Sequence, residues 1–159
     1  ILHPTMIYGA QGENNVQRLA ALLRRLPLVP LPGGGRALVQ PIHQDDLTAA
    51  ILAVIDRDWD KAEALVVAGP EAVTYRDFVL AVAHAAGLPR PRIVPCPAAP
   101  IIGLARLTPF LPFLPRIEPD EVRRLLEDKA FDISGARKTL GFAPISLAEG
   151  LARTFARAG

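Results

Sequence analysis

The residue types that can exchange protons or hold a metal ion are concentrated in one short segment, where His43 is followed by Asp45 and Asp46. An imidazole and two carboxylates could bind a metal or act on a substrate as acid and base. The alternative is a helix start, because a carboxylate there can accept hydrogen bonds from free backbone N–H groups. Apolar residues at helical spacing follow directly. We therefore interpret Asp45 or Asp46 as the helix cap, predict no metal site, and leave His43 open between a structural and a substrate-facing role.

A second candidate is the run of glycines from Gly33 to Gly35, which is followed by Arg36. A phosphate-binding loop requires a strand before the glycines and a helix directly after them. Here a strand-like segment, 37–42, comes next, and this order favours a turn. The alternative that remains is contact between an anionic substrate and Arg36 with the loop amides.

Composition and charge narrow the class of protein. Of the 159 residues, 50% are apolar and 21% are charged, and 18 basic residues face 16 acidic ones. This balance does not predict a nucleic-acid surface. The most apolar stretch, 98–115, contains Arg106 and several prolines, which argues against a membrane span. The single cysteine, Cys96, is compatible with a reducing compartment, and we predict a cytoplasmic protein.

The spacing of apolar residues predicts an α/β fold in which strands alternate with helices. The predicted strands are 2–8, 28–31, 37–42, 64–68 and 92–95. Helices are predicted to begin near Val16, at Asp45 or Asp46, at Thr74 and at Ser146. The last two starts are capping boxes, formed by Thr74 with Asp77 and by Ser146 with Glu149. Pro4 is compatible with the first strand only where its missing N–H lies at an edge or an irregular position.

Several segments, taken in order, resemble the extended short-chain dehydrogenase/reductase family, the NAD-dependent epimerase/dehydratases. They are His3–Gly9, Val39–Leu47, Ala68–Glu71 with Thr74 and Tyr75, Phe131–Ser134 and Leu140–Pro144. The resemblance implies the C-terminal part of a Rossmann-type parallel sheet with a small, mainly helical substrate-binding subdomain. Residues 1–159 would form this single domain.

The resemblance also implies which residues lie near ligands of the full-length parent, whose cofactor would be NAD or NADP and whose substrate would be a small molecule. The cofactor-facing residues would be Pro4, Thr5 and Met6, and the substrate-facing residues Arg36, Gln40 and His43. Sugar-nucleotide epimerases often carry a phosphate-binding arginine four residues before this histidine. Val39 stands there in this chain, so a nucleotide-sugar substrate is not supported.

Two features that the family needs for activity do not occur in this sequence. One is the N-terminal glycine-rich dinucleotide loop, and the other is a Tyr-x-x-x-Lys pair: Tyr8 is followed by Gly12 and Tyr75 by Val79. We expect the N-terminal nucleotide-binding half to be absent, and the chain alone to be inactive, with no catalytic residue of its own and no tight dinucleotide affinity. Whether the chain belongs to an enzyme stays open.

The alternative is a noncatalytic interaction or assembly module derived from the same superfamily, with apolar surface around 104–114. An opening strand without its usual neighbour would expose backbone donors and acceptors. We therefore expect a homo-oligomer that buries Leu2 to Tyr8.

Overall fold

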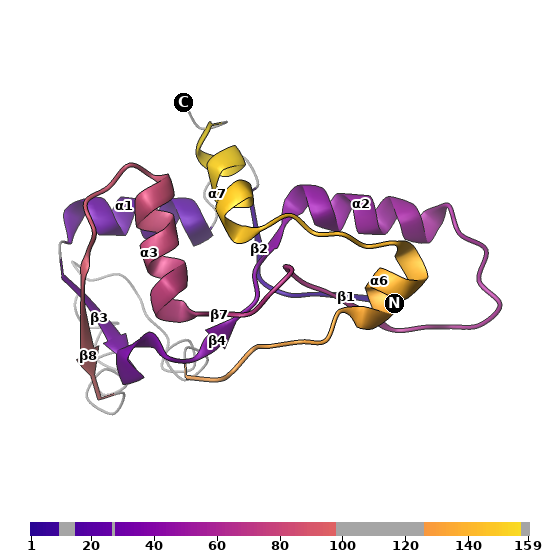
Figure 1. Cartoon of the computed structure of the whole chain (residues 1–159), viewed down its shortest axis with the longest axis horizontal. Coiled ribbons are helices and arrows are strands. Elements are labelled where there is room, and N and C mark those ends of the chain that lie inside the picture. Colours follow the sequence, from indigo (N-terminus) through magenta and orange to yellow (C-terminus); the bar gives the residue numbers. More distant parts are fainter. Residues whose placement is uncertain (10–14, 27, 98–125, 157–159) are drawn as a thin grey trace, which may run out of the picture.

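The computed structural model describes residues 1–9, 15–26, 28–97 and 126–156 (Figure 1). The helices are α1 (Asn15–Arg25), α2 (Gln44–Ile55), α3 (Tyr75–Ala85), α6 (Ser134–Leu140) and α7 (Leu147–Ala156), with a 3₁₀ turn η1 (Gly33–Gly35). The strands are β1 (Leu2–Pro4), β2 (Ile7–Tyr8), β3 (Leu28–Pro32), β4 (Leu38–Val39), β5 (Ile42–His43), β6 (Leu65–Val67), β7 (Val73–Thr74) and β8 (Arg92–Cys96). The apolar stretch 98–115 lies outside the described residues.

Three of the strand pairs are parallel, and the two strands of each pair are connected through other elements. β1 pairs with β6, β2 with β5, and β3 with β8, whereas β4 and β7 are antiparallel. Parallel pairs with helices between their strands are the mark of an α/β fold. The predicted fold class is therefore confirmed. No helix among the described residues is long and apolar enough to cross a membrane.

The strands predicted over 2–8 and 37–42 are each divided, which corrects the sequence analysis. The first forms β1 and β2, which pair with different partners, and the second forms β4 and β5. A proline lies at each division, Pro4 at the end of β1 and Pro41 before β5. Proline is found mainly at the edges and irregular positions of sheets, and each division of a strand is such a position.

The backbone nitrogen of Pro4 points away from β6. The Ile1 carbonyl accepts a hydrogen bond from the Leu65 N–H at 2.9 Å, and the Thr5 N–H donates to the Val67 carbonyl at 3.2 Å. Alternate residues of a parallel strand bond to the same neighbour, so the odd-numbered residues face β6. The missing N–H of Pro4 therefore costs this ladder no hydrogen bond.

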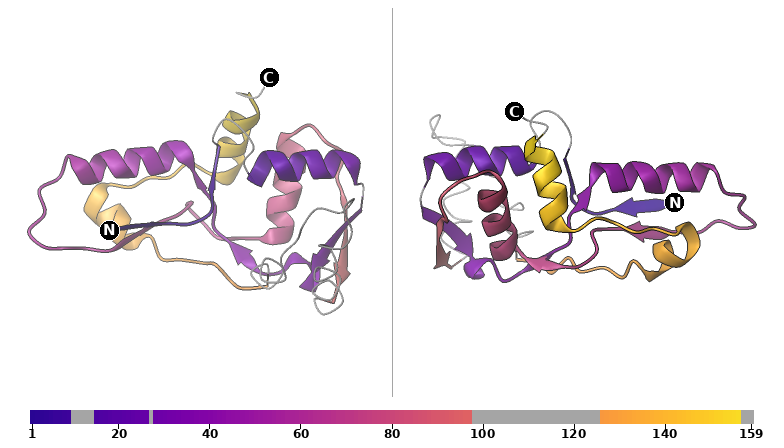
Figure 2. Two further views of the ribbon diagram at one scale, coloured as in Figure 1. Left: turned by 180° about the vertical axis from the view of Figure 1, so that it is seen from behind. Right: turned by 45° about the horizontal axis from the view of Figure 1, so that its top comes forward.

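Apolar residues collect in two cores at opposite ends of the molecule. One core lies among α1, α3, α7 and β3, and its buried members are Tyr8, Val16, Ala20, Leu23, Val29, Leu31, Phe78, Val79, Val82, Ala83 and Leu151. The other lies among α2, α6 and β6, and its buried members are Ile42, Ala50, Leu65, Val67, Ala68, Ile133, Ala136 and Phe142. Figure 2 shows α1 and α3 at one end, α2 and α6 at the other, and α7 between them.

An aromatic pair lies where the two cores meet. The Tyr8 ring packs edge-on against the His43 ring, with centroids 5.3 Å apart and an interplanar angle of 80°. Two glycines make room for these rings: a Cβ atom at Gly9 would collide with the His43 ring, and one at Gly150 in α7 would collide with the Tyr8 hydroxyl. The spacing of β2, β5 and α7 therefore depends on residues without side chains.

We predict that Gly150→Ala destabilises the chain although alanine favours helices. The added methyl group overlaps the Tyr8 hydroxyl, and overpacking of this kind costs about 1–3 kcal/mol. Gly135→Ala in α6 is the matched control, because a Cβ atom there would lie 3.5 Å from Leu65, an ordinary contact. The control should be neutral or stabilising by up to about 1 kcal/mol. The free energy of urea unfolding measures both.

Adding Tyr8→Phe to Gly150→Ala removes the overlapping hydroxyl and should restore part of the lost stability. Equal stability of Gly150→Ala and the unmodified chain would show that α7 does not pack as closely on Tyr8 as described.

Candidate functional site

The three residues predicted to face a cofactor lie at the carboxyl end of β1: Pro4 is its last residue, and Thr5 and Met6 form the turn to β2. Pro4 is exposed, while Thr5 and Met6 are half-buried. The Thr5 hydroxyl donates to the Gln40 carbonyl at 2.5 Å, and the Met6 carbonyl accepts from the Ile42 N–H at 2.9 Å. The turn is therefore fastened to the segment that joins β4 to β5.

Gln40, predicted to face a substrate, is buried at this junction with 4% of its surface exposed. Its Nε2 donates to the Gly69 carbonyl at 2.8 Å, and its Oε1 accepts from the Phe131 N–H at 2.7 Å. These partners fix the orientation of the carboxamide, because a carbonyl can only accept and an N–H can only donate. Gln40 therefore joins three segments that are far apart in the sequence.

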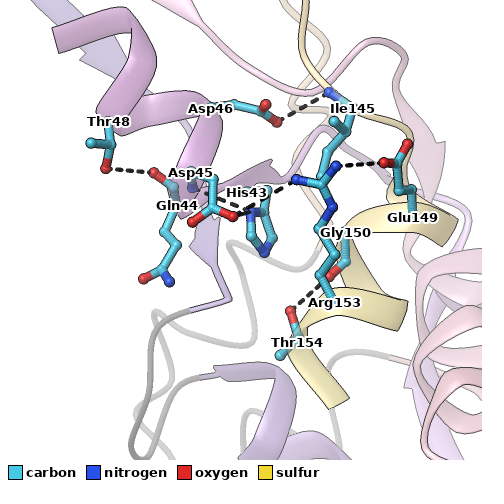
Figure 3. Close-up of polar contacts among 10 residues, drawn as sticks. All are labelled: His43, Gln44, Asp45, Asp46, Thr48, Ile145, Glu149, Gly150, Arg153 and Thr154. Carbon is cyan, nitrogen blue, oxygen red and sulfur yellow. Dashed lines mark hydrogen bonds and ion pairs between the residues drawn. The ribbon is translucent and has the colours of Figure 1, made fainter. Parts of the chain in front are cut away.

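His43, the third residue predicted on the substrate side, ends β5 and is 1% exposed. Its Nδ1 accepts a hydrogen bond from the Asp45 N–H at 3.2 Å (Figure 3). The prediction that Asp45 or Asp46 caps the helix is therefore wrong. Helix α2 begins at Gln44, so both aspartates lie inside its first turn and the histidine caps it.

Asp46 instead connects α2 to the segment before α7. Its Oδ2 accepts from the Ile145 N–H at 3.2 Å. Burial raises the pKa of the Asp46 carboxyl above the ordinary aspartate value. The Ile145 N–H and electrostatic interactions with His43 and Arg153 lower this pKa by smaller amounts, and the interaction with Asp45 raises it. Burial thus disfavours the charged form of the Asp46 carboxyl, although this carboxyl keeps its hydrogen bond from the Ile145 N–H.

An ion-pair chain runs over the surface beside this contact (Figure 3). Arg153 Nη2 lies 2.6 Å from Glu149 Oε1, and Arg153 Nη1 lies 3.9 Å from Asp45 Oδ2. Asp45 Oδ2 also lies 3.5 Å from His43 Nδ1, but this nitrogen accepts the Asp45 N–H, so the contact is not an ion pair. Partly exposed pairs stabilise by less than about 1 kcal/mol each, so they orient α2 and α7 more than they hold them together.

Tyr8 is the one buried phenol beside His43. Burial raises the pKa of its hydroxyl far above the ordinary tyrosine value, and the negative charge of Asp46 adds to this effect. The hydroxyl therefore keeps its proton at any physiological pH.

The glycine run forms the predicted turn. Gly33, Gly34 and Gly35 have φ angles of 59°, 73° and 69°, values that side-chain-bearing residues rarely adopt, and β4 follows them rather than a helix. Arg36 is exposed directly after this turn, separated from Gln40 by β4. The structure thus brings Thr5, Met6 and Gln40 together and leaves Arg36 on the surface.

The sequence analysis missed Gly69 as a member of this site. A Cβ atom there would collide with the Pro41 carbonyl. In the sequence, Gly69 and Pro70 indicate only the end of the strand 64–68. No local pattern indicates that Gly69 lies next to Gln40. Among the described residues, no group of three or more His, Cys, Asp or Glu side chains could hold a metal ion.

The comparisons with known proteins identify the fold. No family model matches the sequence, and no curated protein matches it. Solved structures do match, and over nearly all of its length the chain has the α/β fold of UDP-glucuronic acid 4-epimerase, UDP-glucose 4-epimerase and MoeE5. It spans less than half the length of these proteins.

Three of these structures illustrate the likeness. MoeE5 in complex with UDP-glucuronic acid and NAD is 22% identical, with 99% of this chain and 46% of that one covered at a TM-score of 0.66. UDP-glucuronic acid 4-epimerase from Bacillus cereus, in complex with UDP-glucuronic acid and NAD, is 17% identical, with coverages of 98% and 43% and a TM-score of 0.65. UDP-glucose 4-epimerase from Thermotoga maritima, with UDP-glucose, is 20% identical, with coverages of 99% and 45% and a TM-score of 0.66.

We predict opposite pH effects for two aspartates. The pKa of Asp46 is raised in the folded chain, so the folded state binds more protons than the unfolded state between the ordinary and the raised value, and stability falls as pH rises through that window. The pKa of Asp132 is lowered by hydrogen bonds from the Ser134 N–H and hydroxyl, so its contribution is lost as pH falls through the lowered value.

Urea unfolding of Asp46→Asn and Asp132→Asn between about pH 3 and pH 7 measures both slopes. Relative to the unmodified chain, Asp46→Asn should gain stability as pH rises, and Asp132→Asn should lose it. Parallel curves for all three proteins would contradict the assigned environments.

Proposed function

We propose that this chain is the substrate-binding portion of an NAD(P)-dependent epimerase/dehydratase or reductase of the extended short-chain dehydrogenase/reductase family, inactive by itself. The observation that carries the proposal is the match of 98–99% of the chain to epimerase structures. The turn from Pro4 to Met6 supports it, because ligands of open α/β sheets bind outside the carboxyl ends of the strands.

The candidate residues divide into those that can touch a ligand and those that hold others in place. Pro4 is exposed, and Thr5 and Met6 are half-buried, so this turn can face a nicotinamide ring. Arg36 is exposed and carries a guanidinium that suits an anionic group of a substrate. His43 is buried against Tyr8 and Asp45, and we assign it to shaping the substrate side rather than to binding.

The cofactor of the complete protein would be NAD or NADP, as MoeE5 and the Bacillus cereus epimerase are in complex with NAD. The glycine-rich loop that cradles a pyrophosphate does not occur in this sequence. We therefore propose that the chain alone binds a dinucleotide only weakly. Its cytoplasmic location also stays a prediction.

A noncatalytic assembly module is the second candidate, favoured by apolar surface on α2. Ile51, Leu52 and Ile55 are exposed on this helix, Ile55 to 70%. Within the described part of the chain, the side of β1 that faces away from β6 has no strand beside it. The unpaired edge of β1 suits self-association, and we propose a homo-oligomer through the N-terminal strands.

Thermal unfolding with and without NADH and NADPH tests the first proposal. A ligand at 100 times its Kd stabilises a folded protein by about 2.7 kcal/mol, so tight binding would give a clear upward shift of Tm. We expect no shift at ligand concentrations up to about 100 µM, because the chain lacks a pyrophosphate loop. A clear shift would contradict the proposed weak dinucleotide binding, and turnover of either cofactor with a sugar or carbonyl substrate would contradict the claim that the chain is inactive alone.

Light scattering at micromolar concentration tests the proposed homo-oligomer. We expect a dimer that Ile7→Lys in β2 weakens, because Ile7 is 40% exposed within the proposed interface and a lysine there would have to be desolvated. Ile55→Lys on α2 is the matched control and should leave the dimer intact. A monodisperse monomer would refute the dimer, and loss of the dimer only in Ile55→Lys would move the interface to α2.

A further inference from the structure

The carboxamide of Gln40 occupies the position of a peptide group between two chain segments. It donates to the Gly69 carbonyl at 2.8 Å and accepts from the Phe131 N–H at 2.7 Å. A strand between these segments would form the same two bonds with its backbone. The Gln40 side chain thus joins residues 29 and 91 positions away in the sequence.

The Gln40 side chain fills the position beside Phe131 because the backbone that follows β4 bonds to other residues. The segment 128–131 runs beside β4: the Leu38 N–H donates to Asp128 Oδ1 at 2.9 Å, and the Lys129 N–H donates to the Leu38 carbonyl at 2.8 Å. After β4 the backbone bonds to another segment, because the Gln40 carbonyl accepts from the Thr5 hydroxyl and the Ile42 N–H donates to the Met6 carbonyl. Gln40 extends the ladder by one more bond, to Phe131.

The backbone of the same residue reaches the turn between β1 and β2. The Gln40 carbonyl accepts from the Thr5 hydroxyl at 2.5 Å, and the Thr5 N–H is bonded to the end of β6. Three segments therefore converge on one buried residue: the turn Pro4–Met6, Gly69 just after β6, and the segment 128–131.

We propose that Gln40 is a positioning residue that couples the segment 128–131 to the turn Pro4–Met6, and that it does not contact a ligand itself. This inference rests on the proposed function, which makes that turn the cofactor-facing one. It revises the expected substrate contact, because both polar atoms of the carboxamide are bonded to the backbone and only 4% of Gln40 is exposed. Little of this side chain is accessible to a substrate.

Amide hydrogen exchange of the intact chain tests the coupling without any ligand. Gln40→Leu removes both side-chain bonds while keeping an apolar side chain of similar length. We expect the protection factors of the Phe131 and Thr5 amides to fall at least about tenfold, as local opening becomes easier. The Leu151 amide in the other core should be unchanged. Gln44→Leu, the same substitution on the partly exposed first turn of α2, should change none of these amides.

Gln40→Glu distinguishes the bond to Gly69 from the bond to Phe131. It also makes amide protection depend on pH, which a change in packing alone would not do. The carboxylate can still accept from Phe131 but cannot donate to Gly69, whereas the protonated acid can do both. Protection of Thr5 should therefore be low at neutral pH and should recover as the pH is lowered through the pKa of the new carboxyl, with no such recovery in Gln40→Leu.

Unchanged Thr5 protection in both variants would overturn the coupling, even if Phe131 exchanges faster. Loss of protection throughout the chain, Leu151 included, in both variants would make Gln40 a general stability residue and would also overturn it. Failure of the proposed function is a separate outcome: the exchange pattern would hold, while the complete protein would show no cofactor contact at Thr5.

Discussion

The arrangement of this chain depends on the buried hydrogen bonds of Gln40. A buried carboxamide without partners costs about 1–3 kcal/mol, so the segments that supply its partners are held to it. Those partners are Gly69 and Phe131 for the side chain and Thr5 for the carbonyl. The turn between β1 and β2 bonds to Val67 on one side and to Ile42 on the other, and the Thr5 hydroxyl joins it to Gln40 as well.

The second constraint is steric and acts where the two cores meet. The Tyr8 and His43 rings fill this boundary, and the close approach of Gly9 and Gly150 leaves no space for a methyl group. His43 also caps α2 through Asp45, so one buried ring serves both the packing and the helix start. The charged groups nearby, Arg153 among them, add orientation at the surface and little stability.

Local patterns in the sequence predicted the local features well. The helical spacing of Val16, Ala20 and Leu23 gave α1 its buried face. Thr74 caps α3 by accepting from the Asp77 N–H, and the Asp77 carboxylate accepts from the Thr74 hydroxyl. The partners of the strands were not predictable from the sequence. The first predicted strand pairs with β6 through β1 and with β5 through β2, and this change of partner is decided by tertiary contacts. The cap of α2 was misassigned, since an aspartate is the commoner cap and nothing local marks His43 as buried.

The candidate site was predicted in part for the same reason. Thr5, Met6 and Gln40 were named from a family resemblance, and they do meet, but the manner of their meeting depends on hydrogen bonds across 29 to 91 residues. Arg36 was named with them and lies apart on the surface. Sequence spacing carries no signal for contacts of that range, and even the need for glycine at position 69 arises only from the backbone of Pro41.

The most direct measurement is the scalar coupling that passes through a hydrogen bond, recorded by NMR on the uniformly ¹³C,¹⁵N-labelled chain. The account predicts a cross-peak between the backbone nitrogen of Phe131 and the side-chain carbonyl carbon of Gln40. Absence of that cross-peak, together with an unprotected Phe131 amide, would contradict the claim that the Gln40 carboxamide holds these segments together.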